Sequence, residues 1–331
     1  MRRFLLVWMV LLCVAAPAAL AQDMDWAPVF AAVEAANPKG LEQEVAFDEA
    51  GDWLSVTLAQ TGQLAGWIEG TQWSGMVFAM PEMTPVTWDD VFTDGDAAAA
   101  RIEEIAGADG EANAYAEYTE ISPVPRDSFT VVDGVMTVYY PVDQLSYFSG
   151  RSGAYSFYAY ELDGLLADGV PLTVGDTAQA KDTLAKVLET GALPGPIKAW
   201  TIGLPVADAE DVLGLVDTPD LKDNVAVWQY EAPQMRGISL LSAVDAERTV
   251  GDTISGILAK RMDFSGLCTG IATQEDCIAA LGTPDYTDTV ETADAYSLLP
   301  VGETLTWEGD THTFSMHFAE GTLHAILLMA K

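Results

Sequence analysis

"DGVMTVYYPVDQLSYFSG", residues 133–150, begins as a strand and then breaks into a turn rich in aromatic residues. The valine, threonine and tyrosine content from Val135 onward is typical of a β-strand, and the Asp-Gly pair before it is a turn signal. Two segments of the same character flank it, "SFTVV" at 128–132 and "GAYSFYAY" at 153–160. Three short strands joined by turns predict an antiparallel sheet.

Helical patterns lie upstream of this sheet. Asp25 can cap a short helix through "WAPVFAAVEAA", and Asp96 can cap another through "AAAARIEEIAG" that stops at Gly107. Between them we expect strands at 53–59, "WLSVTLA", and at 75–80, "GMVFAM". The first part of the chain therefore predicts a mixture of helices and antiparallel strands.

The segment "DGVPLTVGD", residues 168–176, predicts a domain boundary. Beyond it the pattern becomes richer in helix, because Asp176 can start a helix through "TAQAKDTLAKVLET" that Gly191 ends. We therefore predict an α+β fold with two domains, residues 22–168 and 169–331. Each is expected to be a mostly antiparallel sheet packed with helices.

The N-terminus has the pattern of a cleavable secretory signal. Arg2 and Arg3 precede an apolar run at 4–16, and the small-residue ending Ala-Leu-Ala follows at 19–21. We expect residues 1–21 to be removed and the mature protein to be periplasmic or secreted. A retained anchor is the alternative, because the run could just span a bilayer. No later run is long enough, so we expect no other membrane span.

The chain is strongly acidic. Its formal net charge is −35, with 50 acidic and 15 basic residues, and removal of Arg2 and Arg3 would make it more negative still. Such a charge disfavours nucleic acid, whose phosphates would be repelled. It leaves two interpretations, solubility in a salty habitat or attraction of a cationic protein partner.

Two of the three cysteines, Cys268 and Cys277, would remain after removal of the signal. In an exported protein we expect them to form a disulfide, which would stabilise the fold by ~2–3 kcal/mol. Redox catalysis has no support, since the sequence contains no Cys-x-x-Cys motif.

Residues 128–166 resemble the last part of the extracellular sensor domain of RsiV-type anti-sigma factors, a domain also found beside a peptidoglycan deacetylase. In that family a strand with an "F…DG" turn leads into an extended segment, a glycine turn, a last strand and a closing "EL…LL" helix. The matching residues here are Phe129, Asp133, Gly134, Tyr140, Pro141, Gly150, Tyr160, Glu161, Leu162, Leu165 and Leu166. With "PVTWDDVFTDGD" at 85–96, the resemblance covers about residues 26–168.

The sequence also departs from that family. The family often has a "GGAH" segment between its early strands, whereas this chain has "TGQLAGW" at 61–67, without histidine. We identify neither a membrane helix after the signal nor a cytosolic sigma-binding domain, so sigma-factor control is not implied. What the resemblance implies is recognition of a small basic protein such as lysozyme.

Residues of the second half, about 200–331, resemble BamE/SmpA-like units, which are also the repeated unit of β-lactamase inhibitory protein. The resemblance is carried by "TQEDCIAALGTPDYTD", in which Thr273 can cap a helix that ends at Gly282, and by the strands that follow. The tripeptide Thr-Pro-Asp at Thr283 also occurs at Thr218. Either the domain contains tandem units or the tripeptide recurs by chance.

Catalytic and metal-binding motifs are not evident. All three histidines lie near the C-terminus, and on "HTFSMHF" alternation puts His312 on the face of the apolar residues and His317 on the opposite face. We interpret them as ordinary sheet residues, because no Gly-x-Ser-x-Gly motif accompanies them. A Cys₂His₂ metal site is the alternative to the disulfide. We expect no catalytic residue, no metal and no cofactor.

Aromatic residues are the candidate binding residues. We expect Tyr139 and Tyr160 to be buried. The candidate surface residues are Tyr147 and Phe148, together with Arg151 and Tyr140, because tyrosine and arginine are enriched in protein interfaces.

Two function classes follow. The first is an exported, non-enzymatic protein-binding protein of the cell envelope, which captures or inhibits a cationic, lysozyme-like or other envelope protein. The alternative is a peptidoglycan-associated enzyme or accessory factor, suggested by the deacetylase that accompanies the related sensor domain. The oligomeric state is not indicated by the sequence.

Overall fold

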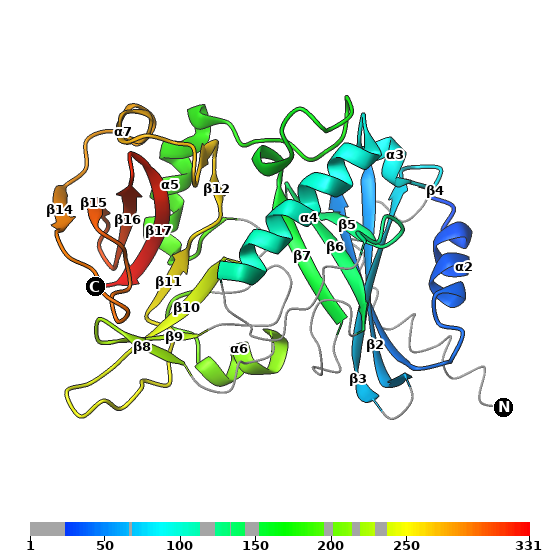
Figure 1. Cartoon of the computed structure of the whole chain (residues 1–331), viewed down its shortest axis with the longest axis horizontal. Coiled ribbons are helices and arrows are strands. Elements are labelled where there is room, and N and C mark those ends of the chain that lie inside the picture. The colour runs from blue at the N-terminus through cyan, green and yellow to red at the C-terminus, as the bar shows by residue number, and fades with distance from the viewer. Residues whose placement is uncertain are drawn as a thin grey trace. The chain divides into compact units, whose positions relative to one another are not determined.

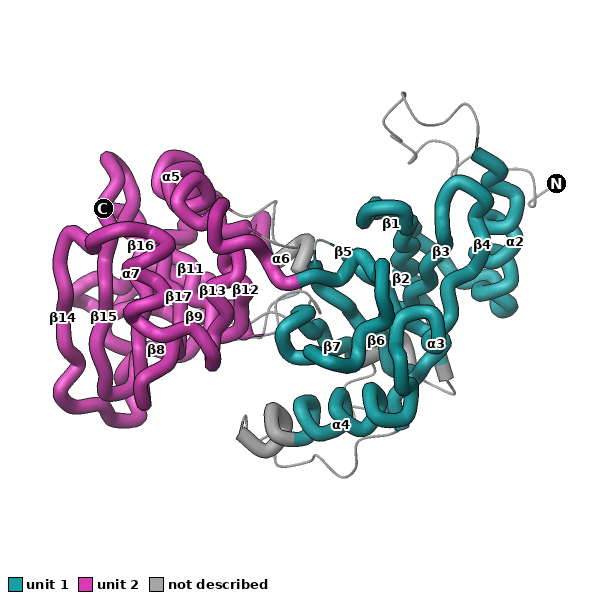
Figure 2. The backbone as a smooth tube through the Cα atoms, turned by 90° about the horizontal axis from the view of Figure 1, so that it is seen from above, with its two compact units in different colours: residues 1–173 teal, residues 174–331 magenta. Residues whose placement is uncertain are grey.

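The structure is a computed structural model that describes residues 24–65, 68–112, 123–132, 134–142, 152–194, 201–213, 219–228 and 237–331. The described strands pair antiparallel and alternate with helices, which confirms the predicted α+β class. The chain divides into two compact units, residues 1–173 and 174–331, shown in separate colours in Figure 2. The sequence placed the boundary a few residues earlier, after Asp168.

Unit 1 contains two antiparallel sheets, in the orders β1-β2-β3-β4 and β5-β6-β7. Its principal elements are α2 (Ala27–Ala35), β1 (Glu42–Ala50), β2 (Trp53–Ala65), β3 (Ile68–Ala79), β4 (Thr84–Pro85), α3 (Trp88–Val91), α4 (Gly95–Ala112), β5 (Phe129–Val132), β6 (Val135–Val142), β7 (Ser152–Tyr158) and the 3₁₀ helix Ala159–Leu162.

The four-stranded sheet of unit 1 is covered on both faces. Alternation along β2 directs Leu54 and Val56 toward α2, whose Val29 is buried in the same cluster. On the other face, Ser55 Oγ donates to Val131 O (2.7 Å) and accepts from the Val131 N–H (2.9 Å), so β5 approaches that face. Helix α4 packs with the β5-β6-β7 sheet in a second cluster. Figure 1 shows α2 and α4 as separate layers of this unit.

Close approach of the two sheets of unit 1 requires a glycine at position 75. A Cβ there would lie 2.6 Å from the Tyr139 ring and 2.8 Å from the backbone of Phe129. Tyr139 is buried, as predicted, and its hydroxyl lies 3.0 Å from Thr130 Oγ1. Burial raises the pKa of Tyr139, so the phenol stays protonated as a buried hydrogen-bonding group. Tyr160, also predicted to be buried, is half-exposed and stacks on Tyr158.

One helix boundary in unit 1 differs from the prediction. Helix α4 begins at Gly95, and Asp94 is the residue whose Oδ1 accepts from the N–H groups of Asp96 and Ala97. Its end, at Ala112, lies beyond the predicted stop at Gly107. Both aspartates are suitable caps by type, and a single glycine costs only about 1 kcal/mol within a helix.

Unit 2 is built on one eight-stranded antiparallel sheet. Its principal elements are the 3₁₀ helix Thr177–Gln179, α5 (Ala180–Thr190), α6 (Val206–Leu213), β8 (Asp220–Lys222), β9 (Val225–Trp228), β10 (Ile238–Ala243), β11 (Gly256–Ala259), β12 (Asp263–Phe264), β13 (Leu267–Cys268), α7 (Gln274–Leu281), β14 (Tyr286–Val290), β15 (Gly302–Glu308), β16 (His312–Ala319) and β17 (Thr322–Ala330).

The sheet of unit 2 consists of two helix-plus-four-strand segments. Helix α6 precedes β8 to β11, and α7 precedes β14 to β17. The sheet order, β14-β15-β16-β17-β11-β10-β9-β8, joins the two sets through their last strands, and Ala259 pairs with Ile326 there. The Thr-Pro-Asp tripeptide that begins at Thr283 lies between α7 and β14, whereas Asp220 of the other tripeptide is the first residue of β8.

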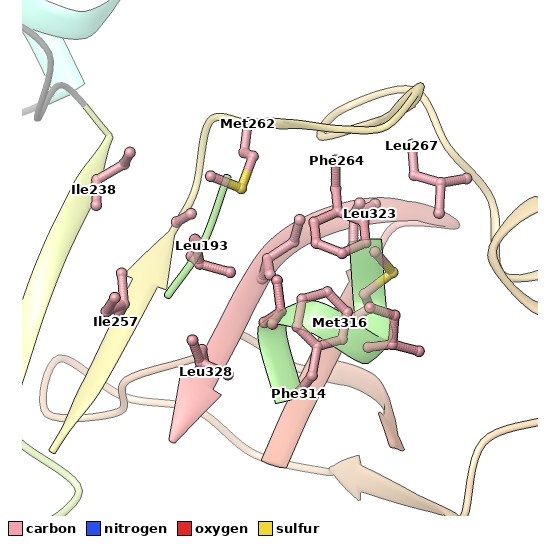
Figure 3. Close-up of a cluster of buried hydrophobic side chains, with 14 of the residues drawn as sticks. Leu193, Ile238, Ile257, Met262, Phe264, Leu267, Phe314, Met316, Leu323 and Leu328 are labelled. Carbon is pink, nitrogen blue, oxygen red and sulfur yellow. The ribbon is translucent and has the colours of Figure 1, made fainter. Parts of the chain in front are cut away.

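The main core of unit 2 lies on one face of this sheet, which we call the inner face. Figure 3 shows Phe264, Phe314 and Met316 among the buried apolar side chains gathered there, and the rings of Phe264 and Phe314 are 4.7 Å apart. Helices α5 and α7 contribute Leu184 and Leu281 to the same cluster. The predicted ends of both helices are confirmed.

Three of these helix ends have the expected local geometry. Thr273 and Asp276 form a reciprocal capping box at the start of α7. Asp176 Oδ1 accepts from the Ala178 N–H, and Gly191 ends α5 with a φ of 67°, in the left-handed region that glycine adopts without strain.

Candidate functional site

The opposite, outer face of the unit 2 sheet carries polar side chains between β15 and β16. Thr304 Oγ1 lies 2.8 Å from His317 Nδ1, and Thr306 Oγ1 lies 2.8 Å from Ser315 Oγ. These residues alternate with inner-face residues such as Phe314, as the sequence pattern of the last strands predicted. All four are buried, so a further segment must cover them.

The covering segment is residues 291–301, which join β14 to β15 and which we call the strap. Leu298 and Leu299 of the strap pack against a small apolar cluster on the outer face. The buried members of that cluster are Val227, Leu241, Leu258 and Ala325. The strap therefore closes part of the outer face, as helices α5 and α7 close the inner face.

The strap is anchored at the far edge of the sheet. The backbone N–H of Asp223, in the turn between β8 and β9, donates to Tyr296 O (3.0 Å), and Asp223 Oδ2 accepts from the Leu298 N–H (2.7 Å). Lys222 Nζ donates to Ala295 O (3.1 Å). One main-chain hydrogen bond, one aspartate carboxylate and one lysine thus connect the loop after one edge strand to the turn beside the other edge strand.

These anchors require the sheet to curl. Eight strands spaced ~4.8 Å apart would place the two edges more than ~30 Å from each other in a flat sheet. The strap has about six residues to reach Asp223 from Val290, which span at most ~20 Å. The outer face is therefore concave, and the strap lies across the concavity.

Three exposed apolar side chains of unit 2 belong to β14 and the strap. Among the described residues, the large exposed apolar side chains are Phe30, Val174, Ile271, Ile278, Tyr286, Tyr296 and Val301. Tyr286 begins β14, while Tyr296 and Val301 belong to the strap, and Tyr296 is 71% exposed. We call β14 with the strap, residues 286–301, the strap surface.

The strap surface is also acidic. Asp288 and Glu291 are exposed and form no ion pair with any described residue. The ion pairs of the described chain lie elsewhere, at Arg101–Glu104, Arg126–Asp96 and Lys331–Glu308. The strap surface therefore combines exposed apolar side chains with negative charge that no described cation neutralises.

Buried histidine lies under the base of the strap. His317 is 1% exposed, and its Nε2 makes no hydrogen bond with any described residue. Burial, together with the neighbouring His324, lowers the pKa of His317, and the Pro300 carbonyl opposes this effect. Burial and the charge of Lys260 lower the pKa of His324. Both imidazoles are therefore neutral at pH 7.

The binding residues predicted from the sequence do not coincide with this surface. Tyr147, Phe148 and Arg151 lie outside the described residues. Tyr140 is fully buried, with its ring 6.3 Å from that of Tyr155, so its prediction as a surface residue is wrong. Alternation along β6 explains the error, because Tyr140 faces the cluster that α4 covers.

The predicted disulfide is not formed in the structure. Cys268 and Cys277 are both buried, and their sulfur atoms are not within bonding distance. Cys277 points from α7 into the main core, where burial and the adjacent Asp276 raise the pKa of its thiol to about 12. A protonated, buried thiol reacts slowly with oxidants. The disulfide stays a prediction from the sequence, and the structure favours the opposite expectation of two free thiols.

Within the ranges that the structure describes, no group of three or more histidine, cysteine or carboxylate residues is arranged to hold a metal ion. None of the described helices is long and apolar enough to cross a membrane. The signal pattern at residues 1–21 lies outside the described residues.

The strap surface was not among the sites expected from the sequence. The outward position of His317 was expected from strand alternation, but the segment that covers it was not. A local signal existed, since Tyr296 and Val301 lie in a polar, acidic connection between two strands. Nothing local indicates that this connection reaches Asp223.

Comparison with known proteins identifies no family for the whole chain. No protein-family model matches the sequence, and no curated protein matches it. The chain is similar to a DUF4309 family protein, YjgB, from Bacillus subtilis subsp. subtilis str. 168, at 16% identity and a TM-score of 0.32. That match covers 46% of this chain and 97% of YjgB.

A second solved structure has a comparable score. A DUF3298 family protein, PA4972, from Pseudomonas aeruginosa PAO1 is 14% identical, with a TM-score of 0.32, and the match covers 42% of this chain and 69% of that protein. The resemblance to RsiV-type sensors is not confirmed by these matches.

Proposed function

We propose that this chain is an exported, non-enzymatic protein-binding protein that captures a cationic protein of the cell envelope, such as a lysozyme-like enzyme, through the strap surface. One observation carries the proposal: exposed apolar side chains and unneutralised carboxylates occur together on residues 286–301. The signal pattern at the N-terminus supports export, and the net charge of −35 supports a cationic partner.

Charge would act first, on the rate of encounter. A strongly negative protein attracts a basic partner over distances near the screening length, about 8 Å at 0.15 M salt. This attraction by itself is weak and non-specific. It would bring the partner to the molecule without selecting one surface.

Aromatic contacts would act second, on specificity. Tyr296 exposes 71% of its surface, while its backbone carbonyl accepts from the Asp223 N–H. The ring therefore extends from an anchored main chain, so that less entropy is lost on binding. Tyrosine anchors of this kind contribute about 2 kcal/mol or more at an interface centre. Asp288 and Glu291 would contact basic groups around the anchor.

The test is direct binding of the mature protein to a lysozyme-type enzyme, measured calorimetrically at low salt and at about 0.15 M salt. Tyr296→Ala should weaken binding roughly thirtyfold at the higher salt, which corresponds to about 2 kcal/mol. Phe30→Ala, at an exposed ring in unit 1, is the matched control and should leave the affinity unchanged. The double variant Asp288→Asn, Glu291→Gln should mainly slow association.

Two outcomes would contradict the proposal. Binding that disappears near 0.15 M salt and does not respond to Tyr296→Ala would be non-specific charge attraction. Binding that survives salt but responds only to Tyr147→Ala and Phe148→Ala would place the contact on the aromatic turn predicted from the sequence. In that case the strap surface would not be the binding surface.

A further inference from the structure

Basic side chains gather at one end of the outer face of the unit 2 sheet. Lys260 follows β11, and strand alternation puts it on the face of Leu258, which belongs to the outer-face cluster. Ala259 of β11 pairs with Ile326 of β17, and extending this register by one residue brings Lys260 level with Ala325. Lys260 therefore projects on the concave side, beside β17.

A β-bulge adds His324 to the same place. Leu323 and Ile326 both face the main core, so the two residues between them, His324 and Ala325, both face outward. The register of the β16–β17 pair shifts at this point, between His317 and Phe318 of β16. As a result the His317 and His324 rings are only 6.3 Å apart, from neighbouring strands.

Lys222 reaches this group from the other edge of the sheet. It pairs with Val225, another residue of the outer-face cluster, and its Nζ is held by Ala295 O of the strap. Lys222 is also an electrostatic neighbour of Lys260. Partial burial lowers the pKa of Lys260, and the positive charge of Lys222 lowers it further. Lys222, Lys260, His317 and His324 form what we call the basic cluster.

Carboxylates do not neutralise the basic cluster. Neither Lys222 nor Lys260 forms an ion pair with any residue that the structure describes. The charge of Glu320 raises the pKa of His324 and so partly offsets its lowering. Glu320 forms no hydrogen bond with Lys222 or Lys260 in the described structure. The carboxylate of Asp223, next to Lys222, is engaged by the Leu298 N–H.

This arrangement is unusual for a chain with 50 acidic and 15 basic residues. Two ammonium groups that approach each other repel, and the repulsion is greatest where water is partly excluded. The cluster nevertheless offers several hydrogen-bond donors, since each ammonium group carries three N–H bonds and a neutral imidazole carries one. An anion would relieve the repulsion and use these donors.

We propose that the basic cluster is a binding site for a doubly charged oxyanion of the phosphate class. Two ammonium groups match two negative charges, and the imidazole N–H of His324 supplies a further donor. A singly charged carboxylate would neutralise only one lysine. The site adjoins the strap, because Lys222 donates to Ala295 O, but it uses other side chains than the proposed protein contact, so either proposal can fail without the other.

Binding of a dianion is linked to proton uptake. His324 is held neutral in part by the charge of Lys260, so an anion that offsets Lys260 raises the pKa of His324. Affinity for the doubly charged form of the anion should therefore increase as pH falls toward 6.5, the ordinary histidine value, once the protonation of phosphate itself is allowed for. A carboxylate-rich surface without this cluster would show no such linkage.

The experiment follows the histidine ring resonances by NMR in the mature full-length chain, with inorganic phosphate added to the order of 10 mM, where millimolar affinity would be detected. The resonances of His317 and His324 should shift in a saturable way. The pKa of His324 should rise when phosphate is bound. Acetate at the same ionic strength should give no saturable shift.

Substitutions separate the site from general charge. Lys260→Met should weaken phosphate binding about tenfold, the effect of losing one charge-assisted contact. Lys181→Met, at an exposed lysine of α5, is the matched control and should leave it unchanged. Without phosphate, Lys260→Met should also raise the pKa of His324, which tests the geometry independently of any ligand.

Three results would overturn the proposal. The first is the absence of any phosphate-dependent shift at His317 and His324. The second is an equal effect of Lys260→Met and Lys181→Met on binding. The third is no response of His324 to Lys260→Met in phosphate-free buffer, because the cluster would then not exist as described.

Discussion

The two faces of the unit 2 sheet are formed by the same strands and are built differently. The inner face carries rings and branched aliphatic side chains, and helices α5, α6 and α7 pack in its core. The outer face carries hydroxyls, histidines and a smaller apolar cluster, and the strap covers part of it. We infer that the inner face contributes most of the stability of unit 2, so that the outer face can carry polar groups.

Polar groups on the outer face are tolerated because they pair across strands. Thr306 and Ser315 occupy opposite positions in register and share a hydrogen bond, as Thr304 and His317 do. A buried hydroxyl with a partner costs little, whereas an unpaired one costs about 1–3 kcal/mol. Four predictions test this division between the faces.

The largest effect is expected from the inner face. Phe314→Ala removes a fully buried ring that contacts Phe264 and Trp307, so the free energy of unfolding should fall by about 3–5 kcal/mol. Ser315→Ala, the next residue but on the outer face, should cost about 1 kcal/mol. Urea unfolding followed by circular dichroism measures both. Equal losses for the two variants would show that the faces do not differ.

The second effect is acid sensitivity of the outer face. The folded state holds His317 at a pKa below its ordinary value of 6.5, so the unfolded chain binds a proton first as pH falls. This histidine therefore leaves stability unchanged above about pH 7 and lowers it as pH falls below 6.5, by at most about 1.4 kcal/mol per pH unit.

Unfolding measured between pH 7.5 and pH 5, about one unit or more on each side of the titration, checks the sign. His317→Gln should flatten the dependence, because glutamine does not titrate. His324→Gln should act in the same direction but less, since this side chain is only half-buried. A wild-type protein that becomes more stable over this acid range would show that the histidines are not held neutral.

The third effect concerns the strap anchor. Asp223→Ala removes the acceptor of the Leu298 N–H, worth about 1 kcal/mol, so hydrogen exchange at Leu298 should become roughly fivefold faster. Asp288→Ala, which removes an exposed carboxylate without an ion pair, is the control and should leave the exchange rate unchanged. If both variants leave the Leu298 amide equally protected, Asp223 does not anchor the strap.

The smallest effect is expected from a reductant, which should not change the free energy of unfolding at all. The reason is that Cys268 and Cys277 are buried in unit 2 and are not bonded in the structure. A disulfide closing this short loop would instead make reduction cost ~2–3 kcal/mol. Thiol titration of unfolded, unreduced protein should find both thiols. A count of zero would restore the disulfide predicted from the sequence.

Features set by nearby residues were predictable from the sequence. The start of the 3₁₀ helix that leads into α5 and the start of α7 follow from Asp176 and Thr273, because capping depends on residues within one turn. The assignment of Phe314 and His317 to opposite faces follows from a period of two. Where two equivalent signals were adjacent, as with Asp94 and Asp96, local reasoning chose the wrong one.

Features that join distant segments were not predictable in this way. The contact of the strap with Asp223 depends on how far the sheet curls, which no single segment determines. The same holds for the cysteines, because a bond depends on the directions of two side chains from separate elements. Tyr140 was misplaced because a tyrosine in a strand is equally suited to a core or an interface.

The junction of β11 with β17 has a consequence for how unit 2 folds. All the other pairings among the described strands of the sheet join strands that are consecutive in the chain. The β11–β17 pairing joins distant segments, and in it Gly256 lies opposite Met329. Each four-strand set can form from local contacts, but this pairing must wait for a long loop to close, which makes it slow. Until it forms, β11 and β17 are open edges, and each can accept the matching strand of a second copy. We therefore expect refolding at high protein concentration to produce a domain-swapped dimer that exchanges one whole set of strands.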